Sequence, residues 1–245
     1  MTKAAIVVGH NARAQGAVRV TDGVSEFVWN SDLADMIRDH APSRVKVFYR
    51  QAGIGYSAEI DRVYAETDAW GADVTIELHF NSVVDRTARG CLTLSSGTTR
   101  SRALAEEVQP RMAAALGVPD RGIRNLSRGD RGGRSLWQGR APAIMVEPWF
   151  GSNPEDCAAA DLHKDKLAEA IYRGAMEFLG VSPNPDPSGR PPAPTPTFPN
   201  QVGDTVVVSP VPDISASIRR LQHLRSITSS LKQIEADLSA LVDLR

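Results

Sequence analysis

The 245-residue sequence is poor in cysteine, which excludes two kinds of stabilising site. Cys91 and Cys157 lack the spacing of a cysteine-based zinc site, and two cysteines cannot form a framework of disulfide bridges. We expect both to be small buried residues.

The sequence also lacks a long hydrophobic run near its first residue. Five apolar residues precede Gly9 and His10, which is too short for the apolar region of a signal peptide or for a membrane span. We therefore expect a protein that is synthesised in the cytoplasm without a signal peptide and has no membrane span.

An excess of one charge sign is missing as well. The 28 basic residues nearly balance the 29 acidic ones and leave a formal charge of -1. No overall field attracts the protein to nucleic acid or to an anionic membrane, so we expect no nucleic-acid partner. The 42% of hydrophobic residues suffice for a full core in a globular protein.

Proline is sparse until residue 181 and then abundant. Ten of the 16 prolines fall in 181–212, a composition that predicts a semi-stiff linker rather than a folded unit. The apolar pattern of residues 213–245 then predicts an amphipathic, coiled-coil-like helix, whose role would be oligomerisation or attachment. A homo-oligomer formed through this helix is one expectation, and a helix packed back on the domain is the alternative. Apolar residues recur there at spacings of three and four: Leu224, Ile227, Leu231, Ile234, Leu238 and Leu241.

Residues 1–180 alternate between strand-like and helix-like segments, which indicates a single α/β catalytic domain. Such alternation predicts a mostly parallel sheet flanked by helices on both faces. We expect strands at 4–10, 44–50, 73–80 and 142–150, and helices at 24–40, 57–70, 101–117 and 161–180.

Three of these strands stop at residues that can bind a metal or move a proton. His10 follows the first strand, His79 ends the third and Glu147 ends the fourth. Ligands of such sheets bind beyond the carboxyl ends of the strands. Glu26 begins the helix after the first strand, so the loop between them would return its carboxylate to the same edge. Two imidazoles and one carboxylate, with a fourth position for water, are a ligand set of catalytic zinc.

Each of these residues also has a structural interpretation. A histidine at a strand end often serves only as a hydrogen-bonding residue, and Glu26 would suit the positive end of a helix dipole. His40, His163 and His223 lie away from this edge, and we expect them to be solvated surface residues.

Four segments of the sequence together resemble the zinc-dependent N-acetylmuramoyl-L-alanine amidases of the Amidase_3 type. They are "VVGHNARAQGAV", "VSEFVWN", "IELHFNS" and "RGGRSLWQGRAPAIMVEPWFGSNPED". The resemblance implies Zn²⁺ held by His10, Glu26 and His79, with Glu147 transferring the proton. Glu77 departs from the family pattern, which usually has serine at this position.

An arginine-rich stretch follows the central helix of the domain. Six arginines lie between residues 120 and 140 against two aspartates. Arginine binds carboxylates bidentately, so this stretch can recognise the carboxylates of a peptidoglycan stem peptide, the substrate that the resemblance implies. Alternatively, arginines in a glycine-rich loop can contact only water. The resemblance singles out Arg121, and we select Arg124 and Asn81 as further substrate-binding candidates.

The resemblance implies cleavage of the amide bond between N-acetylmuramic acid and L-alanine in peptidoglycan. A cytoplasmic origin and a cell-wall substrate are reconciled if the enzyme is lytic, like a phage endolysin, and acts on the wall in the periplasm after release. Two alternatives remain: a zinc amidohydrolase of small N-acyl amino acids, and a non-enzymatic wall-binding scaffold.

Overall fold

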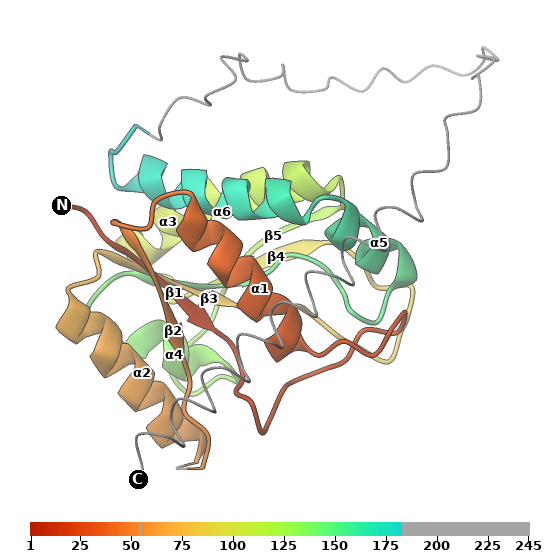
Figure 1. The fold of residues 1–245 in the computed structure, drawn as a ribbon, viewed down its shortest axis with the longest axis horizontal. Coiled ribbons are helices and arrows are strands. Elements are labelled where there is room, and N and C mark those ends of the chain that lie inside the picture. Colours follow the sequence, from red (N-terminus) through yellow and green to blue (C-terminus); the bar gives the residue numbers. More distant parts are fainter. Residues whose placement is uncertain (54, 183–245) are drawn as a thin grey trace, which may run out of the picture. The chain divides into compact units, whose positions relative to one another are not determined.

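The computed structural model describes residues 1–53 and 55–182, and these residues contain one six-stranded sheet (Figure 1). The strand order is β2-β1-β3-β6-β4-β5. Strands β2, β1, β3 and β6 are parallel, β4 is antiparallel to β6, and β5 is parallel to β4. The strands are β1 (Ala4–Val8), β2 (Val45–Tyr49), β3 (Val74–Leu78), β4 (Cys91–Ser95), β5 (Asp120–Asn125) and β6 (Ala143–Glu147).

The predicted α/β class is confirmed, and the sheet has two more strands than the sequence predicted. The sequence prediction missed β4 and β5, which lie at one side of the sheet and run opposite to the other four strands. Strand β5 has no buried residue, so it lacks the apolar run by which buried strands are recognised.

Helices cover both faces of the sheet (Figure 1). One large apolar cluster joins the sheet to α1, α3, α5 and α6, and a separate cluster joins it to α2. Helix α4 packs against β6 and α2. The helices are α1 (Glu26–Asp39), α2 (Tyr56–Trp70), α3 (Thr99–Leu116), α4 (Gly133–Gln138), α5 (Pro154–Leu162) and α6 (Lys164–Phe178).

Local capping explains where the helices near the site begin. Ser25 has extended backbone angles, and its side chain accepts a hydrogen bond from the N–H of Val28, so α1 begins at Glu26. Asn153 caps α5 in the same way, and Pro154 occupies the first helical turn, where its missing N–H costs nothing. The starts of both helices are therefore fixed by the residues that precede them.

The helix predicted at 161–180 is in fact the end of α5 and the whole of α6. His163 separates the two helices because its backbone (φ -123°, ψ 25°) is not helical. Residues 163–166 (HKDK) include no apolar residue, so apolar periodicity gives no information on where one helix ends and the next begins.

The core is concentrated around β1 and β3, whose residues are all buried. Burial of one large aliphatic side chain contributes about 1.5–3 kcal/mol, so these two strands anchor the sheet. Cys91 and Cys157 are buried free thiols, as expected. The buried strands β1 and β3 thus hold the loops that follow them in fixed positions.

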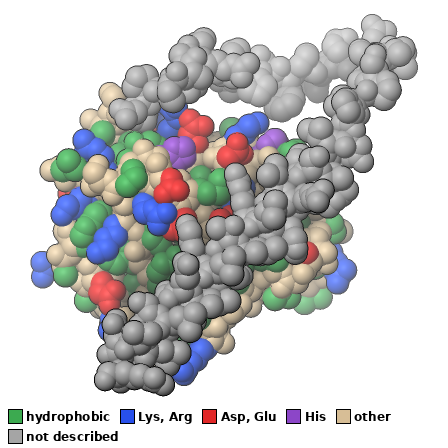
Figure 2. All heavy atoms as spheres, in the orientation of Figure 1, with side chains coloured by type: hydrophobic (Ala, Val, Ile, Leu, Met, Phe, Trp, Pro, Cys, Tyr) green, Lys and Arg blue, Asp and Glu red, His purple; other side chains and the backbone are tan. Residues whose placement is uncertain are grey.

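The visible surface mixes both charge signs. Figure 2 shows Lys and Arg side chains interspersed with Asp and Glu on one face of the described residues, in keeping with the formal charge of -1. Among these residues, no helix combines the length and apolar character that crossing a membrane requires.

The predicted linker at 181–212 and the predicted helix at 213–245 lie outside the described residues, apart from residues 181 and 182. The division of the chain at residue 180 stays a prediction.

Candidate metal centre and active site

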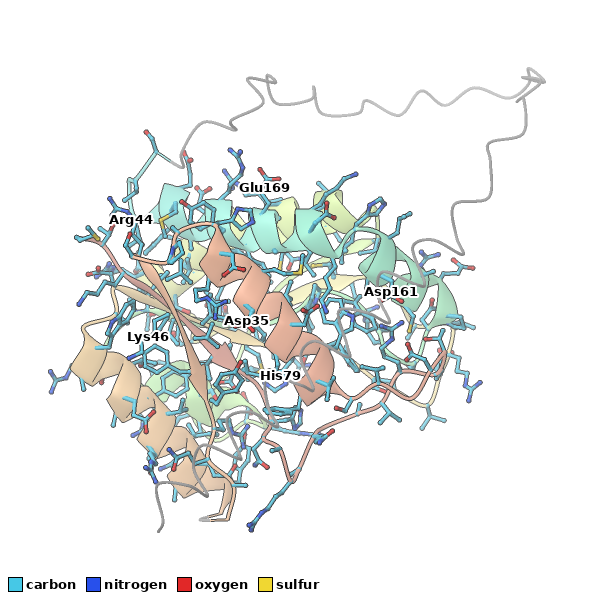
Figure 3. All side chains as sticks on the ribbon, viewed as in Figure 1. Asp35, Arg44, Lys46, His79, Asp161 and Glu169 are labelled. Carbon is cyan, nitrogen blue, oxygen red and sulfur yellow. The ribbon has the colours of Figure 1, made fainter. Side chains whose placement is uncertain are left out.

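The carboxyl ends of three neighbouring strands bring the candidate residues to one edge of the sheet. Val8 of β1 is paired with Leu78 of β3, and Leu78 is paired with Val146 of β6. The ladder continues past the strands, because the N–H of Gly9 donates to the carbonyl of Leu78 (3.0 Å) and that of His79 to the carbonyl of Val146 (3.0 Å). In Figure 3, His79 lies beside the start of α1, at the end of the sheet away from Arg44, the residue before β2. This register fixes where His10, His79 and Glu147 emerge.

Glu26 reaches the same edge through the loop between β1 and α1. The N–H of Glu26 donates to the carbonyl of Ala17 (2.9 Å), and the N–H of Ala17 returns a hydrogen bond to Glu26 Oε2 (2.9 Å). These two bonds fold the loop back on the first turn of α1. The carboxylate therefore points toward the strand ends rather than into solvent.

His10, Glu26 and His79 form a compact group of potential metal ligands. Glu26 Oε2 lies 3.2 Å from His10 Nε2, and Glu26 Oε1 lies 3.1 Å from His79 Nδ1. One ligand atom from each of the three residues lies within 4.8 Å of the others. The His10 side chain is 29% exposed while that of Glu26 is 6% exposed, so the group is open on the His10 side.

The Glu26 carboxylate is held in its ionised form. Burial alone would raise its pKa, but hydrogen bonds with His10 and His79 and the charges of both imidazoles lower it well below the ordinary value. The N–H of Phe80 also donates to Oε1 (3.1 Å). Each carboxylate oxygen thus has one backbone N–H and one imidazole nitrogen as neighbours, which leaves the carboxylate little freedom to rotate.

Two glycines leave no space for side chains around this group. A Cβ on Gly9 would lie 2.4 Å from His79 Nε2 and 2.5 Å from the carbonyl oxygen of Leu78. A Cβ on Gly16, whose φ is +81°, would lie 2.7 Å from Glu26 Oε2 and 2.6 Å from His10 Cδ2. His10 itself has a φ of 64°, a left-handed conformation that is uncommon for residues other than glycine. The backbone is therefore shaped to bring these side chains together.

This donor set fits a zinc ion. Two imidazole nitrogens and one carboxylate oxygen are the protein ligands of one class of catalytic zinc site, in which a fourth position stays free for water or substrate. The hydrogen-bonding backbone groups around Glu26 supply the support that metal-binding carboxylates commonly have.

Glu147 lies beside this group, at the end of β6. The side-chain amide of Asn81 donates to Glu147 Oε2 (2.5 Å). The candidate substrate-binding residue therefore contacts the candidate catalytic carboxylate directly. Burial raises the pKa of Glu147 above its ordinary value, as does the charge of Glu26, whereas His79, Arg131 and Arg124 lower it. Asn81 and Glu147 also lie on neighbouring segments, because Asn81 forms a bridge with Phe150.

The arginines differ in their distance from this edge. Arg124 and Arg131 are close enough to Glu147 for their charges to act on its pKa. The guanidinium of Arg121 instead lies over the ring of Phe150, 5.2 Å from its centroid, and donates to the carbonyl of Arg89 (3.3 Å). The sequence analysis selected Arg121 and Arg124 but not Arg131, because nothing in a glycine-rich loop indicates which arginine faces the site.

Glu77 was the other residue that the sequence analysis left without a role. Its Oε1 lies 3.1 Å from Nε2 of His79, on the side of the ring away from Glu26. The alternation of side chains along β3 is the signal that could have placed the two residues on one face, since they are two positions apart.

Comparisons with known proteins identify a relative of this chain. N-acetylmuramoyl-L-alanine amidase LytC of Bacillus subtilis (strain 168) is 28% identical over 177 residues, which cover 69% of this chain and 34% of LytC. The chain thus matches about a third of the length of that relative.

Solved structures show the same fold. The catalytic domain of CwlV, an N-acetylmuramoyl-L-alanine amidase from Bacillus (Paenibacillus) polymyxa var. colistinus, matches with a TM-score of 0.63 at 23% identity, covering 74% of this chain and 100% of that one. An N-acetylmuramoyl-L-alanine amidase from Clostridium difficile 630 matches with a TM-score of 0.62 at 23% identity, covering 73% and 97%.

The family assignment follows from the sequence match over most of the described domain. Residues 5–177 match the model of the Amidase_3 family, described as N-acetylmuramoyl-L-alanine amidase. This range contains all the residues of the candidate site. The chain therefore belongs to the Amidase_3 family of N-acetylmuramoyl-L-alanine amidases.

Proposed function

We propose that this chain hydrolyses the amide bond between N-acetylmuramic acid and L-alanine of the peptidoglycan stem peptide, with Zn²⁺ held by His10, Glu26 and His79. The observation that carries the proposal is the placement of one ligand atom from each of these residues within 4.8 Å of the others, in a family of amidases. Bound zinc supplies a lowered pKa for water and polarisation of a carbonyl oxygen.

Glu147 is the general base and acid of the proposed reaction. Its carboxylate takes a proton from the attacking water and passes it to the departing amine, a role worth about 10²- to 10⁴-fold in rate. Burial raises the pKa of Glu147, which brings the group closer to the pH at which it must both accept and return a proton. The hydrogen bond from Asn81 occupies Oε2 and so leaves Oε1 for the transfer.

Arg124 and Arg131 supply the positive charge on the side of Glu147, and we propose that they attract the carboxylates of the stem peptide. Asn81 orients Glu147 in this scheme rather than binding the substrate alone, because its amide already donates to Oε2. Arg121 contributes by shaping the loop around Phe150.

The remaining predictions concern the role of the enzyme and the rest of the chain. We propose a catalytic domain over 1–180, followed by the linker at 181–212 and the helix at 213–245 that links copies or attaches them to a partner. A lytic role on the cell wall, like that of an endolysin, is compatible with an amidase domain joined to such a segment, because joining catalytic units can raise avidity by about 10²- to 10⁴-fold.

Purified sacculi provide the test. The zinc-loaded full chain is incubated with sacculi, and the released fragments are identified by mass spectrometry. Free stem peptides that begin with L-alanine, together with lactyl-bearing glycan, are the expected products, and Glu147→Gln serves as the inactive control. Hydrolysis of small N-acyl amino acids without release of peptides would instead favour a small-molecule amidohydrolase, and binding without any release would favour a scaffold.

A further inference from the structure

Glu77 lies directly behind one of the proposed zinc ligands. Glu77 and His79 are two residues apart at the end of β3, so their side chains are on the same face of the sheet. Glu77 Oε1 lies 3.1 Å from His79 Nε2, while His79 Nδ1 lies 3.1 Å from Glu26 Oε1. The two ring nitrogens therefore have different partners, one at the proposed metal site and one behind it.

Glu77 is itself fixed by the elements around it. Its side chain is 1% exposed, and the hydroxyl of Tyr64 on α2 donates to its Oε2 (2.8 Å). Arg50 Nη1 lies 3.9 Å from Oε1, which gives the carboxylate a buried opposite charge but no direct hydrogen bond. Among the described residues, the hydrogen-bonding partner of Oε1 is His79.

The contact of Glu77 Oε1 with His79 meets two needs, one of the buried carboxylate and one at the proposed metal site. A buried carboxylate is costly unless it is hydrogen-bonded or paired. Tyr64 meets that need at Oε2, whereas Arg50 supplies an opposite charge 3.9 Å from Oε1 without a hydrogen bond. The second oxygen is directed at an imidazole whose other nitrogen faces the proposed metal site, which is the geometry of a carboxylate that supports a metal-binding histidine.

We infer that Glu77 is a positioning residue for zinc binding: it accepts the Nε2 proton of His79 and thereby holds the ring with Nδ1 directed at the site of the metal. The inference rests on the proposed zinc site. Without this acceptor, the ring can rotate or exchange its protonated nitrogen, and the binding-competent form is only partly populated. The expected consequence is a lower affinity for zinc.

A neighbouring carboxylate offers a matched control. Glu59 on α2 is also buried and belongs to the same polar network, since Arg50 donates to its Oε2 (3.1 Å) and so does the side-chain amide of Asn11 (2.8 Å). Glu59 has no contact with His79 among its hydrogen bonds and ion pairs. Glu59→Gln thus perturbs the network without removing the acceptor of the ligand.

The experiment measures the zinc affinity of the full chain by competition with a chromogenic chelator. Glu77→Leu removes the acceptor and is expected to lower the zinc affinity about 100-fold. Glu77→Gln keeps an acceptor oxygen but loses the charge, and it is expected to lower the zinc affinity about tenfold. These values are the two ends of the usual range for residues that support a metal ligand. The zinc affinity of Glu59→Gln is expected to stay within about threefold of that of the original protein, because Glu59 does not support a metal ligand. The absorption spectrum of bound Co²⁺ should change in Glu77→Leu and not in Glu59→Gln.

The outcomes separate this inference from the proposed function. If the original protein binds no zinc, the proposed function fails. If it binds zinc and the Glu77 variants bind equally well, or if the Gln and Leu variants lose the same affinity, the inference on Glu77 is overturned while the proposed function stands. Should Glu77→Leu fail to fold, the comparison of Glu77→Gln with Glu59→Gln decides, because a loss no larger than that of the control overturns the inference.

Discussion

Gly9 and His79 are packed so closely that the position of the histidine depends on the absence of a side chain at residue 9. A Cβ on Gly9 would lie 2.4 Å from both Cε1 and Nε2 of the imidazole. The ring cannot keep its place against such an atom, and the carbonyl of Leu78, 2.5 Å from the same point, blocks a compensating shift of the backbone.

Gly9→Ala is therefore expected to abolish stoichiometric zinc binding and, with it, amidase activity. Zinc content after dialysis, measured by mass spectrometry of the metal, checks the first effect. Gly129→Ala is the control, because nothing lies within 4 Å of a Cβ there and its φ is not in the left-handed region. Full zinc occupancy in Gly9→Ala would contradict the assignment of His79 as a ligand.

Replacing Glu147 by Gln should separate proton transfer from metal binding. The side chain keeps its shape and can still contact Asn81, but it no longer accepts a proton from water. We expect kcat on sacculi to fall by about 10²- to 10⁴-fold, with zinc content unchanged. A variant that retains near-original kcat would remove Glu147 from the mechanism.

Zinc binding should release a proton from His79. Burial alone would lower the pKa of this imidazole, but hydrogen bonds to Glu26 and Glu77 outweigh that effect and raise it to about 10 in the metal-free protein. At pH 8 the metal-free ring is then protonated, although an ordinary imidazole would be neutral, and a zinc ligand must give up its proton. Glu26 releases none, because its pKa is lowered well below that of an ordinary carboxyl.

Isothermal calorimetry at pH 8 in two buffers of different ionisation enthalpy measures this release directly. About two protons per zinc are expected at pH 8, one from His79 and one from a water bound by zinc, whose pKa is about 7, and the share from His79 should decrease as the pH rises toward about 10. A release of only about one proton at pH 8 would mean that His79 is already neutral before zinc binds.

The charge of Arg131 should set the acid limit of activity. Arg131 lowers the pKa of Glu147, so Arg131→Ala removes a positive charge that favours the ionised carboxylate and raises that pKa. Because Glu147 must be ionised to accept a proton, the acid limb of the kcat profile should shift to higher pH. Arg128→Ala is the control, since its guanidinium donates to the carbonyl of Trp137 (2.9 Å) and it is not among the groups that shift Glu147. Equal profiles for the two variants would contradict the prediction.

The predictable parts of the fold and site were those encoded by local patterns. Buried strands such as β1 and β3 have continuous apolar runs, and the polar residues that end them pointed to one edge of a parallel sheet. Strand β5 has no such run, because it pairs along one edge and its residues are exposed or half-buried. The break at His163 depends on backbone angles that the apolar spacing does not encode.

Contacts that depend on loop conformation could not be predicted. The hydrogen bonds from Ala17 and Phe80 to Glu26 involve backbone N–H groups, which every residue type provides, so no sequence letter marks them. The pairing of Glu77 with His79 was within reach of strand alternation, but its support by Tyr64 joins β3 to α2 across the fold.

The loop that carries Glu26 into the site is itself held by a partly buried ion pair. Arg19 lies in this loop, is 5% exposed, and donates through Nη1 to Asp161 Oδ1 (2.7 Å) and through Nη2 to Asp161 Oδ2. Its guanidinium also lies 5.7 Å from the centroid of Trp149. Asp161 belongs to α5, so this pair ties the loop to the helical layer.

Asp161→Ala should destabilise the protein because it leaves a buried guanidinium without its main partner. Asp161 is itself about a third exposed, so the expected loss in the free energy of unfolding is about 1–3 kcal/mol, typical of a hydrogen bond to a charged group, rather than the larger value for a fully buried pair. Urea unfolding of the metal-free protein measures it. Asp39→Ala removes an exposed partner of Arg38 and should cost at most about 1 kcal/mol. If both variants lose the same small amount, Arg19 is satisfied by other groups and the ion pair does not anchor the loop.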